Sequence, residues 1–236
     1  MPPRPRLCLL PGLLCDATVW APQLSAFGGA DDIYVPDFRG LDSFGLMAER
    51  VLLQTSGPLA LAGHSMGARV AMEVWRRAPE RVARLALLST GAHGVRPGEA
   101  GPRMELVRLA QAEGMEPVAR AWLPPMLHPD RRDDVALVEP LVRMIRRATP
   151  EMFEGQQQAG LTRRDMTAEL AAVRVPSLVL CGRQDQWSPV AQHEALAAAI
   201  PGARLVIVED CGHMATVERP QAVNLALAGW LAAPAP

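Results

Sequence analysis

The chain has 236 residues, of which 49% are hydrophobic and 21% are charged, and its formal net charge is −1. That length allows one sizeable α/β domain or two small ones, and the composition is that of an ordinary globular protein. All 24 basic residues are arginines scattered along the chain, so we expect neither nucleic acid nor an anionic membrane as a partner.

The apolar run that follows the first residues is too short for the core of a signal peptide, and no stretch reaches the length of a membrane span. These features predict a cytoplasmic protein. The cysteines have no zinc-like spacing and lie in or beside predicted strands, which indicates reduced, structural thiols at Cys8, Cys15, Cys181 and Cys211.

Short apolar runs predict six buried strands, at 7–10, 33–35, 59–62, 85–88, 177–181 and 204–208. Helical spacing of apolar residues predicts helices between them, at 46–54, 66–78, 189–199 and 221–232. Continuous apolar runs that alternate with helices are typical of a parallel sheet buried on both faces. We therefore predict an α/β fold with a doubly wound, mainly parallel sheet of about six strands.

The segment 91–165 departs from this alternation because it predicts helices and no strands. Apolar residues at i, i+3, i+4 and i+7 predict an amphipathic helix through Val138, Leu141, Val142 and Ile145. Thr149-Pro150-Glu151 has the pattern of another helix start. We expect a core formed by 1–90 and 166–236, with 91–165 inserted as a helical lid.

Gly63-His64-Ser65-Met66-Gly67 is a Gly-x-Ser-x-Gly motif between a predicted strand and a predicted helix. In that context the serine lies on a sharp, strained turn with its hydroxyl exposed. The two glycines are required where a side chain would collide with the neighbouring strand or helix. The positive end of the following helix favours a developing oxyanion.

A serine hydroxyl needs an imidazole to accept its proton and a carboxylate to orient that imidazole. Asp185 follows the strand at 177–181, and His213 follows the strand at 204–208. We therefore predict a triad of Ser65, Asp185 and His213. Among the other acidic residues, we expect Asp37 to stabilise a loop and Asp210 to lie in a turn.

The remaining histidines have less specific surroundings. We expect His64 to pack locally, His93 to lie at a lid hinge or line the pocket, and His128 and His193 to face solvent. We expect Glu218 to anchor the loop that holds His213.

The chain resembles the α/β-hydrolase-fold serine hydrolases, and the resemblance covers nearly its whole length. Its motifs are Leu10-Pro11-Gly12-Leu13-Leu14, Gly63 to Gly67, Gly182 to Asp185, and Cys211-Gly212-His213 followed by Glu218-Arg219-Pro220. Within this fold, the chain resembles the small esterase and enol-lactonase-like group, which includes pimeloyl-carrier-protein methyl ester esterases. The resemblance implies an oxyanion hole formed by the backbone N–H groups of Leu13 and Met66. The chain departs from the family in one respect: it starts directly at the strand before Pro11-Gly12, so we expect the N-terminal antiparallel hairpin common in this fold to be missing.

These features predict a serine hydrolase that cleaves a small or medium acyl ester or lactone through an acyl-enzyme, with no cofactor and no metal. A lyase or synthase that uses His213 as a base without a covalent intermediate is the alternative. A silent binding module is a third reading, which the intact triad disfavours.

Apolar lid residues and the Asp185 loop predict the substrate pocket, with Trp122, Met126, Phe153 and Trp187 as its candidates. Arg143, Arg146 and Arg147 share one helix. They form either a solvated face or a site for a substrate carboxylate or for an acidic partner such as a carrier protein. The expected ligand is a small-molecule ester or lactone, and the oligomeric state is left open.

Overall fold

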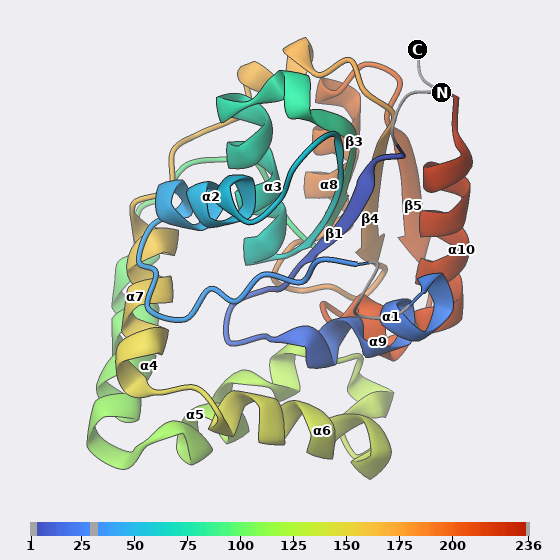
Figure 1. Ribbon diagram of the computed structural model, residues 1–236. Helices are drawn as coiled ribbons and strands as arrows, with labels where there is room; N and C mark the ends of the chain where they lie inside the picture. Colours follow the sequence, from blue (N-terminus) through green and yellow to red (C-terminus); the bar gives the residue numbers. More distant parts are fainter. Residues whose placement is uncertain (1–3, 29–32, 235–236) are drawn as a thin grey trace.

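The computed structural model describes residues 4–28 and 33–234. Its centre is a sheet of five parallel strands in the order β1-β2-β3-β4-β5, which Figure 1 shows between two layers of helices. The strands are β1 (Arg6–Leu10), β2 (Leu59–His64), β3 (Val82–Leu88), β4 (Ser177–Gly182) and β5 (Arg204–Val208). Every strand pair in the described chain is parallel, as predicted from the apolar runs.

The predicted strand at 33–35 is present only as a bridge beside β1. Tyr34 pairs with Cys8 in parallel, its N–H donates to the carbonyl of Leu7, and its carbonyl accepts from the N–H of Leu9. The five strands and this bridge together account for the six apolar runs. The bridge stays short because Pro36 has no N–H to continue the ladder.

Helices cover both faces of the sheet (Figure 1). On one face lie α2 (Phe44–Leu53), α3 (Met66–Arg77) and α8 (Val190–Ala199), and on the other lie α1 (Ala21–Phe27), α9 (Ala215–Glu218) and α10 (Pro220–Ala232). Alternate residues of β1 join different cores: Cys8 and Leu10 face the α3 side, and Leu9 faces the α10 side. This period of two follows from strand geometry.

Between β3 and β4 the described chain forms helices and turns over the carboxyl ends of the strands (Figure 1). The helices are α4 (Ala100–Glu113), α5 (Met115–Trp122), α6 (Val135–Arg146) and α7 (Pro150–Leu161). The amphipathic spacing predicted through residues 138–145 is the buried face of α6. Thr149 caps α7 by accepting a hydrogen bond from the N–H of Met152, as its sequence pattern predicts.

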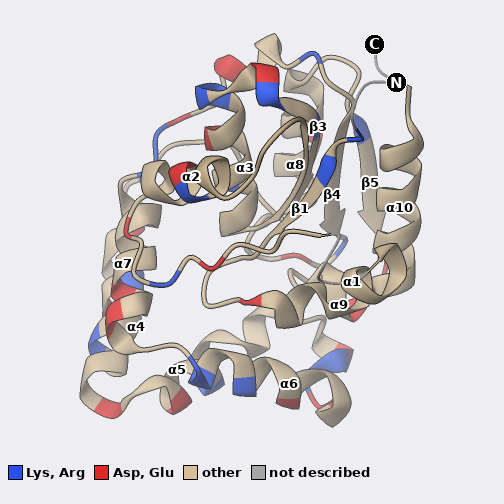
Figure 2. Ribbon diagram, viewed as in Figure 1, with Lys and Arg blue, Asp and Glu red and all other residues tan. Residues whose placement is uncertain are grey.

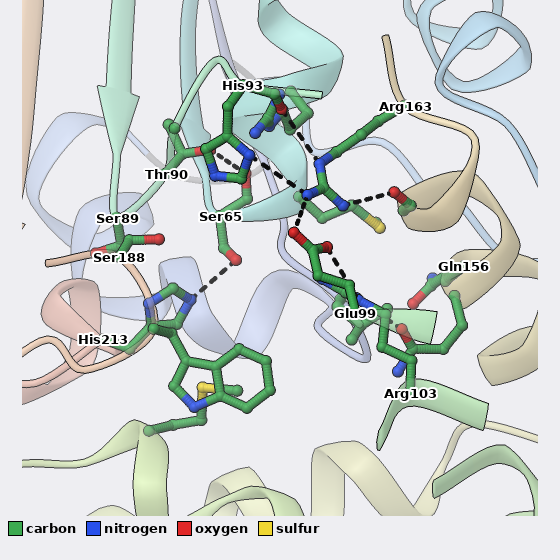
Figure 3. A pocket seen from close by; sticks show the side chains of 18 of the residues that line it. Ser65, Ser89, Thr90, His93, Glu99, Arg103, Gln156, Arg163, Ser188 and His213 are labelled. Atoms are coloured by element: carbon green, nitrogen blue, oxygen red, sulfur yellow. Dashed lines mark hydrogen bonds and ion pairs between the residues drawn. The ribbon is translucent and has the colours of Figure 1, made fainter. Parts of the chain in front are cut away.

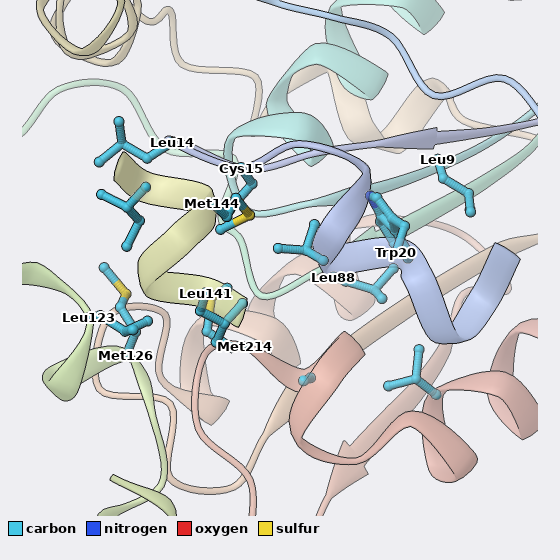
Figure 4. Packing of buried hydrophobic residues seen from close by; sticks show 14 of the residues in the cluster. Leu9, Leu14, Cys15, Trp20, Leu88, Leu123, Met126, Leu141, Met144 and Met214 are labelled. Carbon is cyan, nitrogen blue, oxygen red and sulfur yellow. The ribbon is translucent and has the colours of Figure 1, made fainter. Parts of the chain in front are cut away.

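Short 3₁₀ helices complete the architecture, as η1 (Ala17–Trp20), η2 (Pro79–Arg81), η3 (Pro124–Met126), η4 (Pro129–Arg131) and η5 (Glu169–Ala172). An apolar cluster joins the lid helices to the core (Figure 4). Leu141 and Met144 of α6 belong to it, together with Leu14, Cys15 and Met214 of the core. Burial of this apolar surface holds the lid over the sheet.

The described part of the chain contains no helix both long and apolar enough to cross a membrane. Arginines and acidic residues are intermixed over the lid helices α4 to α6 (Figure 2). The four cysteines are free and buried. Burial raises the pKa of the Cys8 thiol to about 12, so these thiols are packing residues, as predicted.

Candidate active site

Ser65 connects β2 to α3 in a backbone conformation that L-residues rarely adopt, with φ 54° and ψ −113°. A Cβ at Gly63 would collide with the backbone of Ala68, and a Cβ at Gly67 would collide with the carbonyl of Leu10. Only glycine therefore allows strand and helix to approach this closely. The turn presents the Ser65 side chain to a cavity at the carboxyl edge of the sheet.

The structure brings Ser65, His213 and Asp185 together, although they are far apart in the sequence (Figure 3 shows the first two). The distance from His213 Nε2 to Ser65 Oγ is 2.9 Å. His213 Nδ1 lies 2.8 Å from Asp185 Oδ2 and 3.0 Å from Oδ1. Because a carboxylate accepts from Nδ1–H, the Nε2 lone pair is directed at the serine hydroxyl.

Asp185 is held as a carboxylate. Burial alone raises its pKa, but the charge of His213 and the hydrogen bonds from His213 and from the N–H of Ser188 outweigh burial and lower it. The N–H groups of Trp187 and Ser188 both donate to Oδ1, at 2.9 and 2.8 Å. An ionised carboxylate in this position fixes the imidazole tautomer.

The His213 loop is held by groups from the core and the lid. Glu218 Oε1 accepts from the N–H groups of Gly212 and Met214, both at 3.1 Å, so Glu218 anchors this loop as predicted. The N–H of His213 donates to the carbonyl of Met126 in the lid at 2.8 Å. The other Glu218 oxygen accepts from the N–H of His128 at 2.8 Å, so one carboxylate ties the lid to the catalytic edge.

His64 packs beneath His213, as predicted for a local packing role. Its Nε2 lies 2.9 Å from the carbonyl of His213, and the two ring centroids are 5.3 Å apart. Burial, followed by the nearby His213, lowers the pKa of His64 to about 4. His64 is therefore a neutral donor to the His213 backbone at physiological pH.

Leu13 and Met66 both line the cavity, and the backbone N–H of neither residue donates a hydrogen bond within the described chain. Gln156 of α7, which no sequence pattern singles out, supports the loop of Leu13 from the lid: its Oε1 accepts a hydrogen bond from the N–H of Leu14 at 2.8 Å. Gln156 is among the residues that line the cavity, and its Nε2 is buried without a hydrogen-bond partner in the described chain. Its bonding partner lies 142 residues away, which is why local patterns miss it.

The cavity measures about 560 Å³, within the usual range for small-molecule sites. Trp122, Met126 and Trp187 line it, as expected. The expectation for Phe153 is wrong: its side chain is fully buried in the apolar cluster that joins the lid to the core. Because packing encloses it on all sides, Phe153 presents no surface to a ligand.

The arginines at the end of α6 form ion pairs and lie outside the cavity lining. Arg143 pairs with Glu139 at 3.5 Å, Arg146 with Glu116 at 2.9 Å, and Arg147 with Asp16 at 2.6 Å. All three side chains are more than half exposed. This arrangement matches a solvated helix face, which was one of the two readings of the sequence.

His193 does not face solvent, contrary to the expectation from its helix. It is fully buried, its Nε2 accepts from the N–H of Thr90 at 2.9 Å, and its Nδ1 lies 3.2 Å from the carbonyl of Pro189. It therefore joins the Asp185 loop to the end of β3. Asp37 pairs with Arg39 on the surface, and Asp210 lies in a turn with φ 48°, both as expected.

Comparisons with known proteins extend this picture. The chain is 29% identical over 234 residues to the pimeloyl-acyl-carrier-protein methyl ester esterase of Nitrosomonas europaea. This alignment covers 92% of each protein. It is 26% identical over 241 residues to 3-oxoadipate enol-lactonase 2 of Acinetobacter baylyi, with 95% of this chain and 87% of the relative covered. A thermophilic esterase from Thermogutta terrifontis, solved with malate bound, aligns with a TM-score of 0.87 at 28% identity, covering 98% of this chain and 90% of the other.

The comparison with protein families agrees with the fold. Residues 9–226 match the alpha/beta hydrolase family, from β1 to α10. The matched residues include the turn at Ser65 between β2 and α3, and the loops that carry Asp185 and His213. The chain therefore belongs to the alpha/beta hydrolase family.

Proposed function

We propose that this protein is a serine hydrolase that cleaves a carboxylic ester or lactone through a covalent acyl-enzyme. The observation that best supports this proposal is a continuous chain of hydrogen bonds. It runs from Ser65 Oγ to His213 Nε2 at 2.9 Å and from His213 Nδ1 to Asp185 Oδ2 at 2.8 Å. This chain couples a nucleophile, a base and an orienting carboxylate in one cavity.

In the first half-reaction, Ser65 Oγ attacks the carbonyl carbon while His213 Nε2 takes the hydroxyl proton. The N–H groups of Leu13 and Met66 stabilise the oxyanion. The carbon–oxygen bond to the alcohol then breaks, and imidazolium gives its proton to the leaving alkoxide. Asp185 stabilises the imidazolium throughout.

In the second half-reaction, water attacks the acyl-enzyme carbonyl with His213 again as base. The bond to Ser65 Oγ breaks and the serine recovers its proton. An ester gives a carboxylic acid and an alcohol. A simple lactone gives one hydroxy acid, and an enol-lactone gives an enol acid that tautomerises to a keto acid.

The named relatives support ester chemistry, because a methyl ester and an enol-lactone both carry an acyl–oxygen bond. The name of the first relative includes an acyl-carrier protein, and an acidic carrier protein needs a basic surface on which to bind. In this chain Arg143, Arg146 and Arg147 are each paired with a carboxylate. We therefore propose a small-molecule ester or lactone as the substrate.

Mass spectrometry of the protein mixed with a chromogenic acetate ester tests the mechanism. We expect a transient acetyl group on the peptide that contains Ser65, a burst of alcohol release, and neither signal in Ser65→Ala. Turnover should fall by about 10⁶ in that variant, as in serine proteases that lose the nucleophile. Turnover of the ester that persists in Ser65→Ala would contradict the covalent mechanism. Absence of acyl-Ser65 and of ester turnover in wild type would favour the lyase alternative, in which His213 acts as a base without a covalent intermediate.

A further inference from the structure

The cavity that contains Ser65 is strongly cationic, although the whole chain carries a formal charge of −1. Its lining includes four arginines and a single acid, Glu99. Those arginines are Arg69, Arg96, Arg103 and Arg163. A cavity with a formal excess of three positive charges attracts anions and disfavours cations.

Two of these arginines have structural partners that account for their positions. Arg163 donates to the carbonyls of Gly160 and Gly94 at 2.8 and 3.0 Å, and it pairs with Glu99 at 2.6 Å. Arg103 donates to Gln157 at 2.8 Å and lies 3.8 Å from Glu99. The only acid in the lining is therefore already engaged.

Arg69 has no such partner. Its side chain belongs to the cavity wall, only 9% of the residue is exposed, and its Nη1 is enclosed without a hydrogen-bond acceptor in the described chain. Across residues 4–28 and 33–234 no carboxylate lies within ion-pair distance of it. The nearby Asp165 already accepts from the N–H groups of Gly94 and Thr167, at 3.2 and 2.8 Å.

The position of Arg69 is also electrostatically unfavourable for a cation. It lies one turn after Ser65, in the first turn of α3, where the positive end of the helix dipole repels positive charge. Burial and then the neighbouring Arg163 lower its pKa to about 9. Asp165 and Glu99 act on Arg69 only through space, without an ion pair to it. A buried charge without a hydrogen-bonded partner is costly, and an anionic ligand that pairs with Arg69 reduces that cost.

We propose that Arg69 binds a carboxylate at the far end of the acyl chain, so that this enzyme prefers esters or lactones whose acyl part carries a second, ionised carboxyl group. The planar guanidinium matches a carboxylate and forms charge-assisted hydrogen bonds with it. This inference rests on the proposed function.

The arrangement around Ser65 places this carboxylate on the acyl side. In Figure 3, His213 lies on one side of Ser65, and Arg163 and Arg103 lie on the other. The leaving alkoxide must lie beside His213 to receive its proton. The acyl chain therefore extends towards the arginines.

A series of matched methyl esters tests the inference. Monomethyl esters of dicarboxylic acids are compared with methyl esters of monocarboxylic acids of equal chain length, for wild type and for Arg69→Met, Arg69→Lys and Arg120→Met. We expect wild type to prefer the acidic esters in kcat/KM. Arg69→Met should lower the ratio of acidic to neutral kcat/KM by about 10- to 100-fold, the loss expected for hydrogen bonds to a charged group.

The other variants separate charge from geometry. Arg69→Lys should keep part of the preference, because it retains the charge but loses the planar fork. Arg120 pairs with Glu116 on the lid surface with its side chain 76% exposed, so Arg120→Met should keep the wild-type ratio. Inhibition of neutral-ester hydrolysis by glutarate and by butyrate gives a second measurement on wild type alone, and glutarate should inhibit more strongly.

Several outcomes would overturn the inference: an unchanged ratio in Arg69→Met, equal inhibition by glutarate and butyrate, or a preference for carboxylates placed on the alcohol side of the ester. If Arg69→Met fails to fold, the glutarate comparison decides. Hydrolysis of neutral esters without any dependence on Arg69 would leave the proposed function intact. Absence of hydrolysis and of acyl-Ser65 for every ester would instead contradict the proposed function itself.

Discussion

Backbone strain is concentrated around the candidate site. Within residues 4–28 and 33–234, the non-glycine residues with positive φ are Leu14, Ser65, Ser89 and Asp210. Leu14 follows Leu13, the proposed oxyanion residue, and Ser65 is the proposed nucleophile. Ser89 directly follows β3 and lines the cavity, and Asp210 lies three residues before His213. Strained residues persist where surrounding contacts over-determine them. Here each of them lies in a loop that contributes a residue to the cavity lining, namely Leu13, Ser65, Ser89 or His213.

At the residue scale, Asp185→Asn should reduce kcat/KM by about 10⁴, as the same change does in a serine protease. An amide can donate to His213 Nδ1 and so stabilise the wrong tautomer. Steady-state kinetics with one ester, for Asp185→Asn, Asp37→Asn and Asp210→Asn, measures the effect. The two surface changes are controls and should retain most of the activity. Near-normal activity of Asp185→Asn would show that the orienting acid lies elsewhere.

At the scale of elements, lid and core are joined at the catalytic edge itself. Gln156 of α7 holds the N–H of Leu14, the carbonyl of Met126 holds the N–H of His213, and Glu218 bonds to both the lid and the His213 loop. The lid helices are therefore part of the support of the site. A change in the lid can alter turnover as well as substrate choice.

Gln156→Met should lower kcat by roughly 10-fold, less than the 10²–10³-fold cost of removing an oxyanion donor, because it loosens the loop without deleting a donor. KM for a short neutral ester should change less than kcat. Gln158 lies exposed on the same helix, and Gln158→Met is the matched control. A rise in KM with unchanged kcat would show that Gln156 binds substrate without positioning the loop.

The arginines of α6 provide a second test at this scale. Replacing Arg143, Arg146 and Arg147 together with Gln should leave kcat and KM nearly unchanged for both acidic and neutral esters, because each exposed pair contributes at most about 1 kcal/mol. Kinetics at low salt is the stringent condition, since exposed charges are screened over about 10 Å at 0.1 M. A rise in KM confined to acidic esters would assign substrate attraction to this helix.

For the whole molecule, buried histidines make stability depend on pH. Burial lowers the pKa of His64 to about 4, and it also lowers that of His193. Between their unfolded and folded pKa values the unfolded chain binds more protons, so stability falls as pH decreases from about 6.5 towards about 4. Above this window both rings are neutral in either state and their contribution is constant.

We expect the free energy of unfolding to decrease from neutral pH to about pH 5, with His64 accounting for up to roughly 3 kcal/mol over its full window. Urea denaturation at both pH values, in wild type and His64→Asn, measures this. The variant should lose less stability between the two pH values, whatever its stability at neutral pH. His128→Asn, on a half-exposed loop, should retain the wild-type dependence. Equal pH dependence in wild type and His64→Asn would contradict the role of His64.

The sequence by itself determined which segments form the sheet and which residues form the candidate triad. Apolar runs mark buried strands, and helical periodicity marks the helices between them, because both depend on short-range spacing. The carboxyl ends of parallel strands lie at one edge, so Ser65, Asp185 and His213 had to approach one another there. The need for glycine at 63 and 67, on either side of Ser65, follows from local sterics as well.

Only the tertiary structure decided how the lid meets the core. Periodicity identifies an apolar helix face but not its partner, so it did not distinguish the enclosed Phe153 from the cavity-lining Trp122. Likewise, nothing local reveals that Gln156 bonds to Leu14, that His193 is buried, or that Arg69 Nη1 is buried without a hydrogen-bond partner in the described chain. These properties depend on contacts between residues distant in sequence, and such contacts exist only once the helices have packed.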